Sequence, residues 1–300
     1  MLNPLIALKN RISSKHLERM YLSFILPKIE FGSIFYNCAP NYALITLDRL
    51  HYRAALVVTV AIKGSSEIKV LSALIWKSLS ERRQEKMATL MYKVTKNKVP
   101  RYVHDIYRNL QNPGVERALL ARHEYNIPAR SSTKFTNSPA IAPIRIWKTI
   151  SFDVKNSPSI SAFKSRYNKW KYNPNPRSVL TTKLNLKRSI EIKLNRIRVD
   201  LASRADFYRH NFKEFTDPSC PCGYQQQTKS HLLLDCPLSN GAREVFTQNL
   251  KELPSFNYNN FATLTKSSKI KIMLFGDCKL SDECNKEITN LSANLIDKII

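Results

Sequence analysis

Helical spacing dominates the apolar pattern of the chain. In residues 44–62, apolar positions recur at steps of three and four, at Leu47, Leu50, Ala54, Val57 and Ala61. Such spacing places the apolar side chains on one face of an α-helix. Further helices are predicted for residues 77–98, 184–204, 238–253 and 281–300. The pattern therefore predicts a mainly α fold, built as an irregular helical assembly.

Two stretches differ in amino-acid composition from these helices. Residues 112–143 are rich in proline, serine and asparagine, which predicts a linker or an extended segment. Residues 158–176 return to helical spacing, with aromatic and basic side chains interleaved. The whole chain therefore divides into three predicted segments. These are a helical region at 1–111, a linker with an aromatic and basic helix at 112–180, and a basic helix, a Cys/His module and C-terminal helices at 181–300.

The aromatic stripe of Ile160, Phe163, Tyr167 and Trp170 has two interpretations. Rings between cations suit nucleic acid, because bases stack on rings while amines meet phosphates. An aromatic stripe at helical spacing is more often part of a core, and the core interpretation is favoured here. In residues 184–204 an apolar stripe runs from Leu186 to Leu201, and the basic residues are expected to cover the rest of the helix: Lys187, Arg188, Lys193, Arg196 and Arg198.

The charge of the chain is high and unevenly distributed. Lys and Arg number 48 against 23 Asp and Glu, a formal net charge of +25. All of this excess lies in residues 1–216, because the basic and acidic residues of 217–300 cancel. An excess of this size attracts polyanions, so RNA or DNA is the first partner to expect. The neutral segment 217–300 is the place to expect a protein partner.

The candidate phosphate contacts are cations on the predicted helices. The first are Arg82, Arg83 and Lys86, and the alternative for their helix is an ordinary solvated face. Phosphate needs only positive charge at the right place, so each assignment rests on charge alone. The full set of candidates is Arg82, Arg83, Lys86, Lys93, Lys164, Lys169, Arg196 and Arg198.

Targeting signals are not visible. The N-terminal residues carry Lys9 and Arg11 and lack the continuous apolar core of a signal peptide. The longest apolar run, AALVVTVAI, is far short of the ~20 residues that span a bilayer. We therefore expect an intracellular protein of the nucleus or cytoplasm, neither secreted nor in a membrane.

The most specific motif is a cluster with the spacing C-x-C-x8-H-x4-C, made by Cys220, Cys222, His231 and Cys236. Gly223 supplies the backbone freedom for the first turn, and a short helical turn from His231 must end before Cys236. Four nitrogen and sulfur ligands describe a closed, structural Zn²⁺ site with no place for a catalytic water. The alternatives are a disulfide, which would leave a third thiol unpaired, and chance spacing of buried cysteines.

The order of these pieces resembles the C-terminal portion of reverse transcriptases from non-LTR (LINE-type) retrotransposons of animals. The closest stretch is 217–246, which resembles the family's zinc-knuckle-like element and the Arg-bearing helix after it. Residues 15–36 resemble the helix that follows the polymerase palm, although Phe31 and Tyr36 stand where Tyr and Trp are usual. Further resemblance lies in residues 47–55 and 78–94, and in a linker around Trp147 and Phe163, where Lys148 replaces the usual Asn.

The resemblance implies a thumb-to-C-terminus region that holds template and primer without catalysing their extension. A polymerase needs paired Asp residues that bind two metal ions. The dipeptide Asp-Asp does not occur in the chain, and no stretch resembles the palm. We expect a truncated element copy, a gene-model fragment or a domesticated remnant. The rival interpretations are a helical scaffold for a protein partner and a product with no cellular role.

We predict that the chain will not extend a primer. With template, primer, nucleotides and Mg²⁺, product should stay at the level of a buffer control, because the carboxylates that would hold the metal ions are missing. A known polymerase in the same mixture serves as the positive control. Extension above the buffer level by the purified chain would contradict the expectation.

Overall fold

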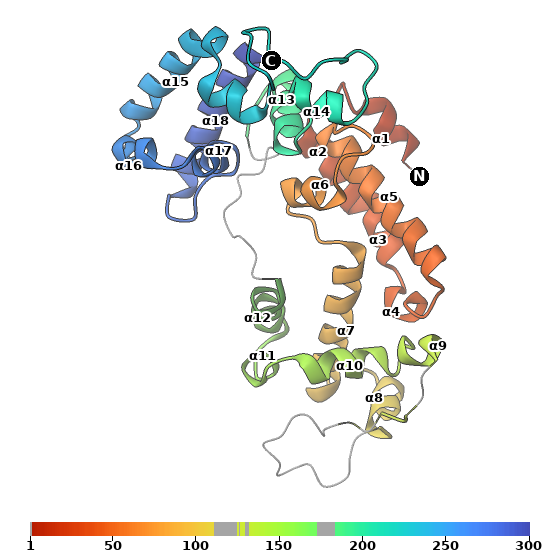
Figure 1. Cartoon of the computed structure of the whole chain (residues 1–300). Helices are drawn as coiled ribbons and strands as arrows, with labels where there is room; N and C mark the ends of the chain where they lie inside the picture. Colours follow the sequence, from red (N-terminus) through yellow and green to blue (C-terminus); the bar gives the residue numbers. More distant parts are fainter. Residues whose placement is uncertain (1, 111–124, 126, 130–131, 173–183) are drawn as a thin grey trace. The chain divides into compact units, whose positions relative to one another are not determined.

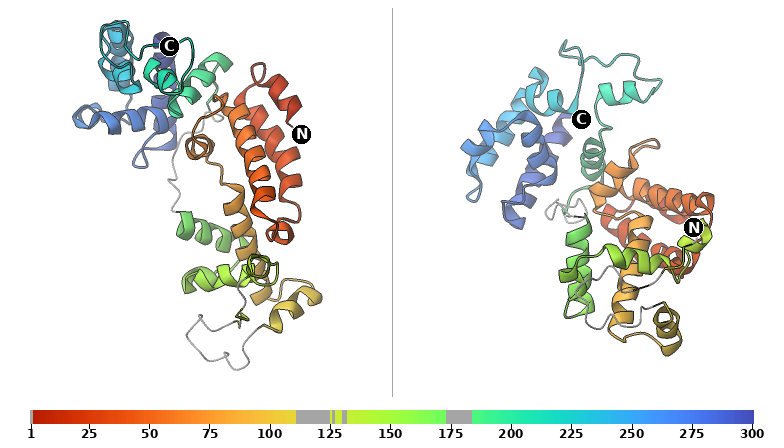
Figure 2. Two further views of the ribbon diagram at one scale, coloured as in Figure 1. Left: turned by 45° about the vertical axis from the view of Figure 1, so that its right-hand side comes forward. Right: turned by 60° about the horizontal axis from the view of Figure 1, so that its bottom comes forward.

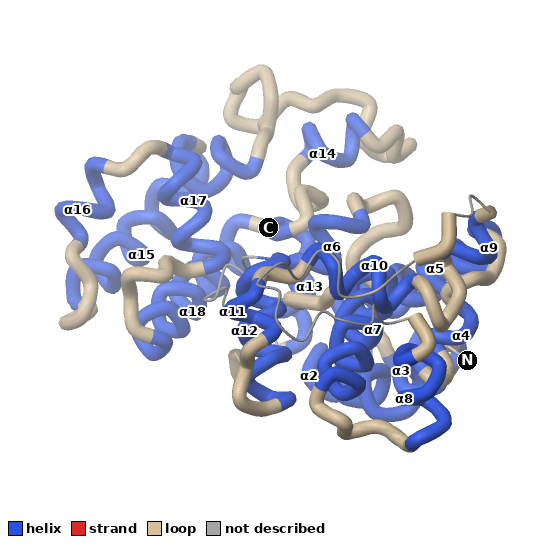
Figure 3. The backbone as a smooth tube through the Cα atoms, turned by 90° about the horizontal axis from the view of Figure 1, so that it is seen from below, coloured by secondary structure: helices blue, strands red, loops and turns tan. Residues whose placement is uncertain are grey.

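The computed structural model describes residues 2–110, 125, 127–129, 132–172 and 184–300. Within these ranges the regular elements are helices and no strand is present, which confirms the mainly α class (Figure 1, Figure 3). Neither is there, in the same ranges, a helix with the length and apolarity to cross a bilayer. The helices are α1 (Asn3–Leu8), α2 (Ser14–Met20), η1 (Tyr21–Ile25), α3 (Leu26–Glu30), α4 (Ser33–Tyr36), α5 (Asn41–Thr59), α6 (Glu67–Leu74), α7 (Leu79–Thr95), α8 (Arg101–Arg108), α9 (Thr133–Thr136), α10 (Ala142–Thr149), α11 (Phe152–Lys155), α12 (Ile160–Tyr172), α13 (Arg188–Arg198), α14 (Arg204–Arg209), η5 (His231–Asp235), η6 (Pro237–Ser239), α15 (Asn240–Glu252), α16 (Tyr258–Thr263), α17 (Lys266–Phe275) and α18 (Asp282–Ile299).

The chain forms two compact units, each made of separate segments. Unit 1 contains Met1–Leu26, His51–Trp76 and Asn175–Ile300. Unit 2 contains Pro27–Leu50 and Lys77–Pro174. The three segments expected from the sequence follow chain order, and that division stays a prediction.

Helix α7 is the central element of unit 2, and α10 and α12 pack along it. The helix starts at a capping box, in which the Ser78 hydroxyl accepts from the Glu81 backbone N–H and the Glu81 carboxylate accepts from the Ser78 N–H at 2.8 Å. Each group satisfies a backbone donor that the first turn leaves without a partner. The buried face of α7 joins a core made by Ala88, Met91, Tyr92, Val94, Ile144, Trp147, Ile150, Val154, Phe163 and Tyr167, among others.

The aromatic stripe of α12 belongs to this core. Phe163 and Tyr167 are fully buried, and the Phe163 ring stacks on Tyr92 with 4.6 Å between centroids. Trp170 lies at the edge and remains 40% exposed. The core interpretation is therefore confirmed for Phe163 and Tyr167, which are not available to stack on bases.

The C-terminal part of unit 1 is organised around α18, which α13, α15 and α17 all contact (Figure 2). The helix begins where the sequence predicted, because the Ser281 hydroxyl accepts from the Cys284 backbone N–H. Its apolar face, including Ile288, Leu295 and Ile296, is buried in one cluster with α13 and α17.

A buried ion pair joins the N-terminal segment of unit 1 to α13. Glu191 is 2% exposed and accepts hydrogen bonds from the Ser14 backbone N–H and from the Arg188 guanidinium, at 3.1 and 2.8 Å. Arg188 also donates to the Lys9 carbonyl oxygen. A buried carboxylate is tolerated only when it is paired and hydrogen-bonded in this way.

We predict that Phe163→Ala will lower the free energy of unfolding of unit 2 by about 3–5 kcal/mol, because it opens a cavity in a closed core. Phe152→Ala is the matched control, since the same side chain is 61% exposed on α11 and should change stability by less than about 1 kcal/mol. Denaturant unfolding of both variants measures the difference. Equal effects of the two substitutions would contradict the assignment of this core.

Candidate metal centre and basic pocket

The first half of the Cys/His cluster is a tight turn. The Gly223 N–H donates to the Cys220 carbonyl oxygen at 2.9 Å, and the Cys220 N–H donates to the Tyr224 carbonyl oxygen at 2.8 Å. Gly223 has φ +92°, in the region that L side chains rarely adopt. The glycine thus allows the turn that brings together two cysteines with one residue between them.

The second half is a single π-helical turn, η5, in unit 1. The Cys236 N–H donates to the His231 carbonyl oxygen at 2.7 Å, five residues back. This hydrogen bond explains the spacing H-x4-C, because a π turn brings residues five apart to the same side of the helix. The backbone becomes extended at Cys236, and Pro237 follows, so the helical turn ends before Cys236 as predicted.

The four donor atoms meet in one place. The ligand atoms of Cys220, Cys222, His231 and Cys236 all lie within 4.8 Å of one another. The Cys220 and Cys236 Sγ atoms are 3.7 Å apart, and Cys222 Sγ is 3.2 Å from His231 Nε2. Two thiolates on a tetrahedral ion at a metal–sulfur distance of ~2.3 Å would lie about 3.8 Å apart. The cluster could therefore hold a metal ion, and the Sγ separation is far beyond a disulfide bond.

The electrostatics of the site favour ionisation of Cys220 before that of Cys222. Burial opposes ionisation of Cys220, but hydrogen bonds from the Cys222 backbone N–H and the Gln227 side chain lower the pKa of its thiol to about 6. At Cys222 the Tyr224 backbone N–H favours the thiolate, while desolvation and the nearby Cys220 sulfur outweigh it and raise the pKa. A cation between the sulfurs would remove this mutual repulsion.

Neighbouring side chains hold the ligands in position. The Tyr224 ring stacks on His231 with 4.4 Å between centroids and 7° between planes. The side-chain amide of Gln227 donates to Cys220 Sγ at 3.5 Å, and the Oε1 atom of the same amide accepts from the Arg204 backbone N–H at 3.0 Å. Contacts of this kind orient metal ligands and fix their geometry.

The cluster is also tied to the helices around it in unit 1. Leu233, in the middle of η5, is fully buried in the core that contains α13 and α18. Arg243, on α15, donates to the Cys236 carbonyl oxygen at 2.7 Å. Asp235 pairs with Lys266 at 2.8 Å, and Lys229 pairs with Asp200 at the end of α13. The centre thus connects α13, α15 and α17.

Half of the predicted phosphate contacts gather in one pocket of unit 2. Arg82, Lys86 and Lys93 on α7 and Lys164 on α12 line a cavity of about 540 Å³, together with Lys77. Two carboxylates, Glu30 and Glu85, lie among these cations. Positive charge exceeds negative charge in the lining, so the site, called here the basic pocket, can attract an anion.

Glu30 holds two of the cations in place. Its carboxylate pairs with Arg82 and, at 3.0 Å, with Lys86. Burial raises the pKa of this carboxyl, but the hydrogen bonds and charges of Arg82 and Lys86 prevail and hold it below its ordinary value. For Lys93 and Lys164 the described residues form no ion pair of this kind. Sequence reasoning missed Lys77, which precedes the capping residue of α7.

The other predicted contacts are not brought to this pocket. Arg83 is 6% exposed and lies on a different side of α7, 3.8 Å from Asp48. Lys169 is exposed on α12, and Arg196 is half-buried on α13 in unit 1. Arg198 is buried over the ring of Phe275, and burial lowers the pKa of its guanidinium to about 9. The expectation that Arg198 covers the outer side of its helix is wrong, because neighbouring helices enclose α13 on more than one side.

Comparison of the chain with models of protein families, with curated proteins and with solved structures gave no match.

We predict that the purified chain holds about one metal ion, and that Cys220→Ser lowers this ratio sharply, because a hydroxyl is a far weaker ligand than a thiolate. Cys38→Ser is the matched control, since Cys38 lies outside the cluster and should leave the ratio unchanged. Elemental analysis of protein purified without chelator gives the ratio. A folded, metal-free wild-type chain would contradict the assignment.

Proposed function

We propose that the chain binds RNA or DNA through backbone phosphates, that it is not itself an enzyme, and that it carries one structural Zn²⁺. The observation that carries the proposal is the basic pocket, where four cations chosen from the sequence as phosphate contacts line one cavity. The uneven net charge supports it, because the whole +25 lies in residues 1–216. Phosphate contacts supply most non-specific nucleic-acid affinity.

Zinc is the metal that this ligand set suits best. Three thiolates and an imidazole are soft and borderline ligands, and four of them complete a tetrahedral shell. The site connects helices of unit 1, which is the role expected of a structural ion. Its role would be to fix α13, α15 and α17 around η5, with a contribution to folding on the order of 10 kcal/mol.

The resemblance to the region after the palm of a LINE-type reverse transcriptase is part of this proposal. The order of the helices, the Cys/His element and the Arg-bearing helix α15 support it, and Arg243 of that helix contacts the element directly. In such an enzyme the region would hold template and primer. The chain would accordingly bind a nucleic-acid strand without extending it.

A helical scaffold for a protein partner is the rival function. The neutral segment 217–300 and the exposed apolar side chains of the chain favour it, for example Leu238 at 70% and Val245 at 49% exposure. The two functions differ in their response to salt, because displaced counterions make nucleic-acid affinity fall steeply as salt rises. Apolar protein contacts lack this dependence.

We predict that Lys93→Glu combined with Lys164→Glu will weaken binding to single strands of any sequence and flatten the plot of log affinity against log salt by about two units. The two lysines line the basic pocket, and their reversal breaks no ion pair among the described residues. Titration of labelled RNA and single-stranded DNA at several salt concentrations measures the slope. The core joins α13 to α18, so point variants are preferred to truncation.

Lys271→Glu combined with Lys279→Glu is the matched control. Both lysines are exposed in the neutral segment, so the same change of net charge is made outside the basic pocket. This control should alter affinity only slightly. Salt-indifferent binding, or equal losses in the two double variants, would refute the electrostatic model and favour the scaffold.

A further inference from the structure

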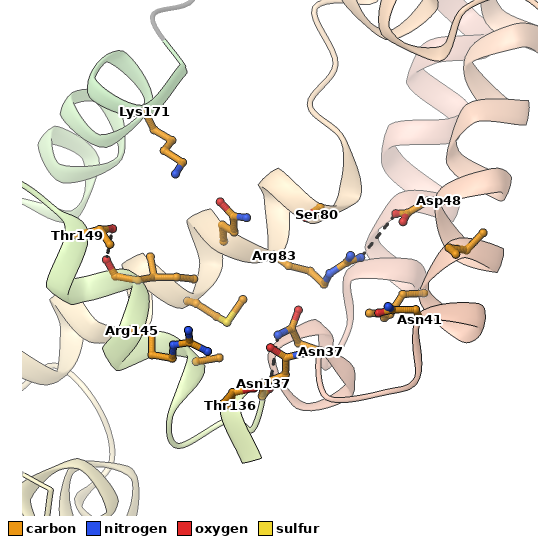
Figure 4. A pocket seen from close by; sticks show the side chains of 16 residues that line it. Asn37, Asn41, Asp48, Ser80, Arg83, Thr136, Asn137, Arg145, Thr149 and Lys171 are labelled. Atoms are coloured by element: carbon orange, nitrogen blue, oxygen red, sulfur yellow. Dashed lines mark hydrogen bonds and ion pairs between the residues drawn. The ribbon is translucent and has the colours of Figure 1, made fainter. Parts of the chain in front are cut away.

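A second cavity of unit 2 lies on another side of α7. It has a volume of about 580 Å³ and is bounded by α5, α7 and α10, with Lys171 of α12 at its rim (Figure 4). Its size is that of a small-ligand site. The basic pocket and this cavity share two helices. The adjacent residues Arg82 and Arg83 of α7 line one each, and α12 supplies Lys164 to the basic pocket and Lys171 to this cavity.

The cavity contains a buried cation whose hydrogen bonds are incomplete. Arg83 is 6% exposed, and its Nε and Nη1 atoms find no acceptor among the described residues. The carboxylate of Asp48 faces it, but the Nη1 and Oδ1 atoms are 3.8 Å apart, too far for a hydrogen bond (Figure 4). Asp48 Oδ1 is likewise buried without a donor. Leaving such groups unmatched is costly, so a polar ligand that entered the cavity and completed their hydrogen bonds would be favoured there.

The rest of the lining argues against a bare anion. Leu44, Ile45, Met87 and Ile146 supply apolar walls, and an anion near Arg83 would also face the carboxylate of Asp48. Amide side chains complete the polar part of the lining, with Asn37, Asn41 and Asn137 close together in Figure 4. A flat ligand with apolar faces and an edge of alternating donors and acceptors fits this combination. Nucleobases have that chemistry, and Arg, Asp and Asn are the side chains that read their edges.

Two cations at the rim of the cavity are placed to bind the phosphate group of a nucleotide. Arg145 on α10 and Lys171 on α12 are exposed and line the same cavity. If the edge of a base met Arg83 and Asp48, its sugar and phosphate would extend toward solvent. Arg145 and Lys171 lie on that side of the cavity. The lining thus separates a base-reading interior from a phosphate-binding rim.

We propose that this cavity binds one unpaired nucleotide of the held strand, with the base edge against Arg83 and Asp48 and the phosphate at Arg145 and Lys171. The inference rests on the proposed function for the source of the nucleotide, a bound single strand. It adds to that function a site that recognises a base, so the chain would distinguish strands that present a splayed base from strands that carry phosphates alone.

The test compares ligands with and without bases on the full-length chain. One arm titrates a short single-stranded RNA against an abasic strand of equal length, which keeps the phosphates. The other titrates nucleoside monophosphates against ribose 5-phosphate, which reports free nucleotide binding. The wild type should prefer the base-bearing ligand by about tenfold, the discrimination expected of a good bidentate base contact.

Two variants at the cavity and one neighbour make the result specific. Arg83→Met removes the guanidinium and keeps an unbranched side chain, and Asp48→Asn changes the opposite partner with little change of shape. Each should reduce the preference for bases several-fold while the salt slope for strands stays within about one unit of wild type. Arg82→Met is the matched control, because it should weaken base-bearing and abasic strands alike and keep their ratio. If Arg83→Met does not fold, as thermal unfolding would reveal, Asp48→Asn decides.

The outcomes separate this inference from the proposed function. A base preference that is absent in the wild type, or unchanged in both cavity variants, overturns the nucleotide site, while salt-dependent strand binding would still stand. Binding of monophosphates that Arg83→Met abolishes, with no binding of strands, supports the cavity as a free-nucleotide site and overturns the proposed function. If the chain bound neither strands nor monophosphates, both the nucleotide site and the proposed function would be overturned.

Discussion

Each unit carries a surplus of positive charge, and carboxylates that each pair with two cations offset part of it. Glu30 pairs with Arg82 and Lys86 in unit 2, and Asp200 pairs with Lys69 and Lys229 in unit 1. In both cases the cations outweigh the effect of burial and hold the pKa of the carboxyl below its ordinary value. Their stabilisation is therefore present above the ordinary pKa and is lost as pH falls through the lowered one. The pairs fix elements that like charges would otherwise push apart.

The carboxylates pair with only some of the cations, so other cations near them can still bind phosphate. In the basic pocket Glu30 orients Arg82 and Lys86, while Lys93 and Lys164 add charge to the same cavity. A set of cations held in place loses less conformational freedom on meeting phosphate than mobile side chains do. In unit 1, Asp200 connects α6, the end of α13 and the segment before η5, so the same device positions the candidate metal centre.

Helix α7 links the two inferred binding sites through its periodicity. Successive side chains on an α-helix point about 100° apart, so Arg82 and Arg83 face different cavities although they are neighbours in sequence. The third side of the helix, with Ala88, Met91 and Tyr92, is buried against α10 and α12. One helix therefore carries the core of unit 2, cations for phosphate and the guanidinium proposed to read a base.

What the sequence determined by itself was local. Helical spacing predicted most of the long helices, including one over residues 281–300 that corresponds to α18. The spacing of Cys220, Cys222, His231 and Cys236 predicted a cluster that the described structure brings together. Such features depend on residues close in the chain, so their physics can be read from the chain. The partners that lie far apart were decided by the tertiary structure: Glu30 beside Arg82, Asp48 beside Arg83, and Phe275 over Arg198. Charge and periodicity identify a basic residue on a helix, but which sides of that helix are buried depends on packing against elements that the local pattern does not specify.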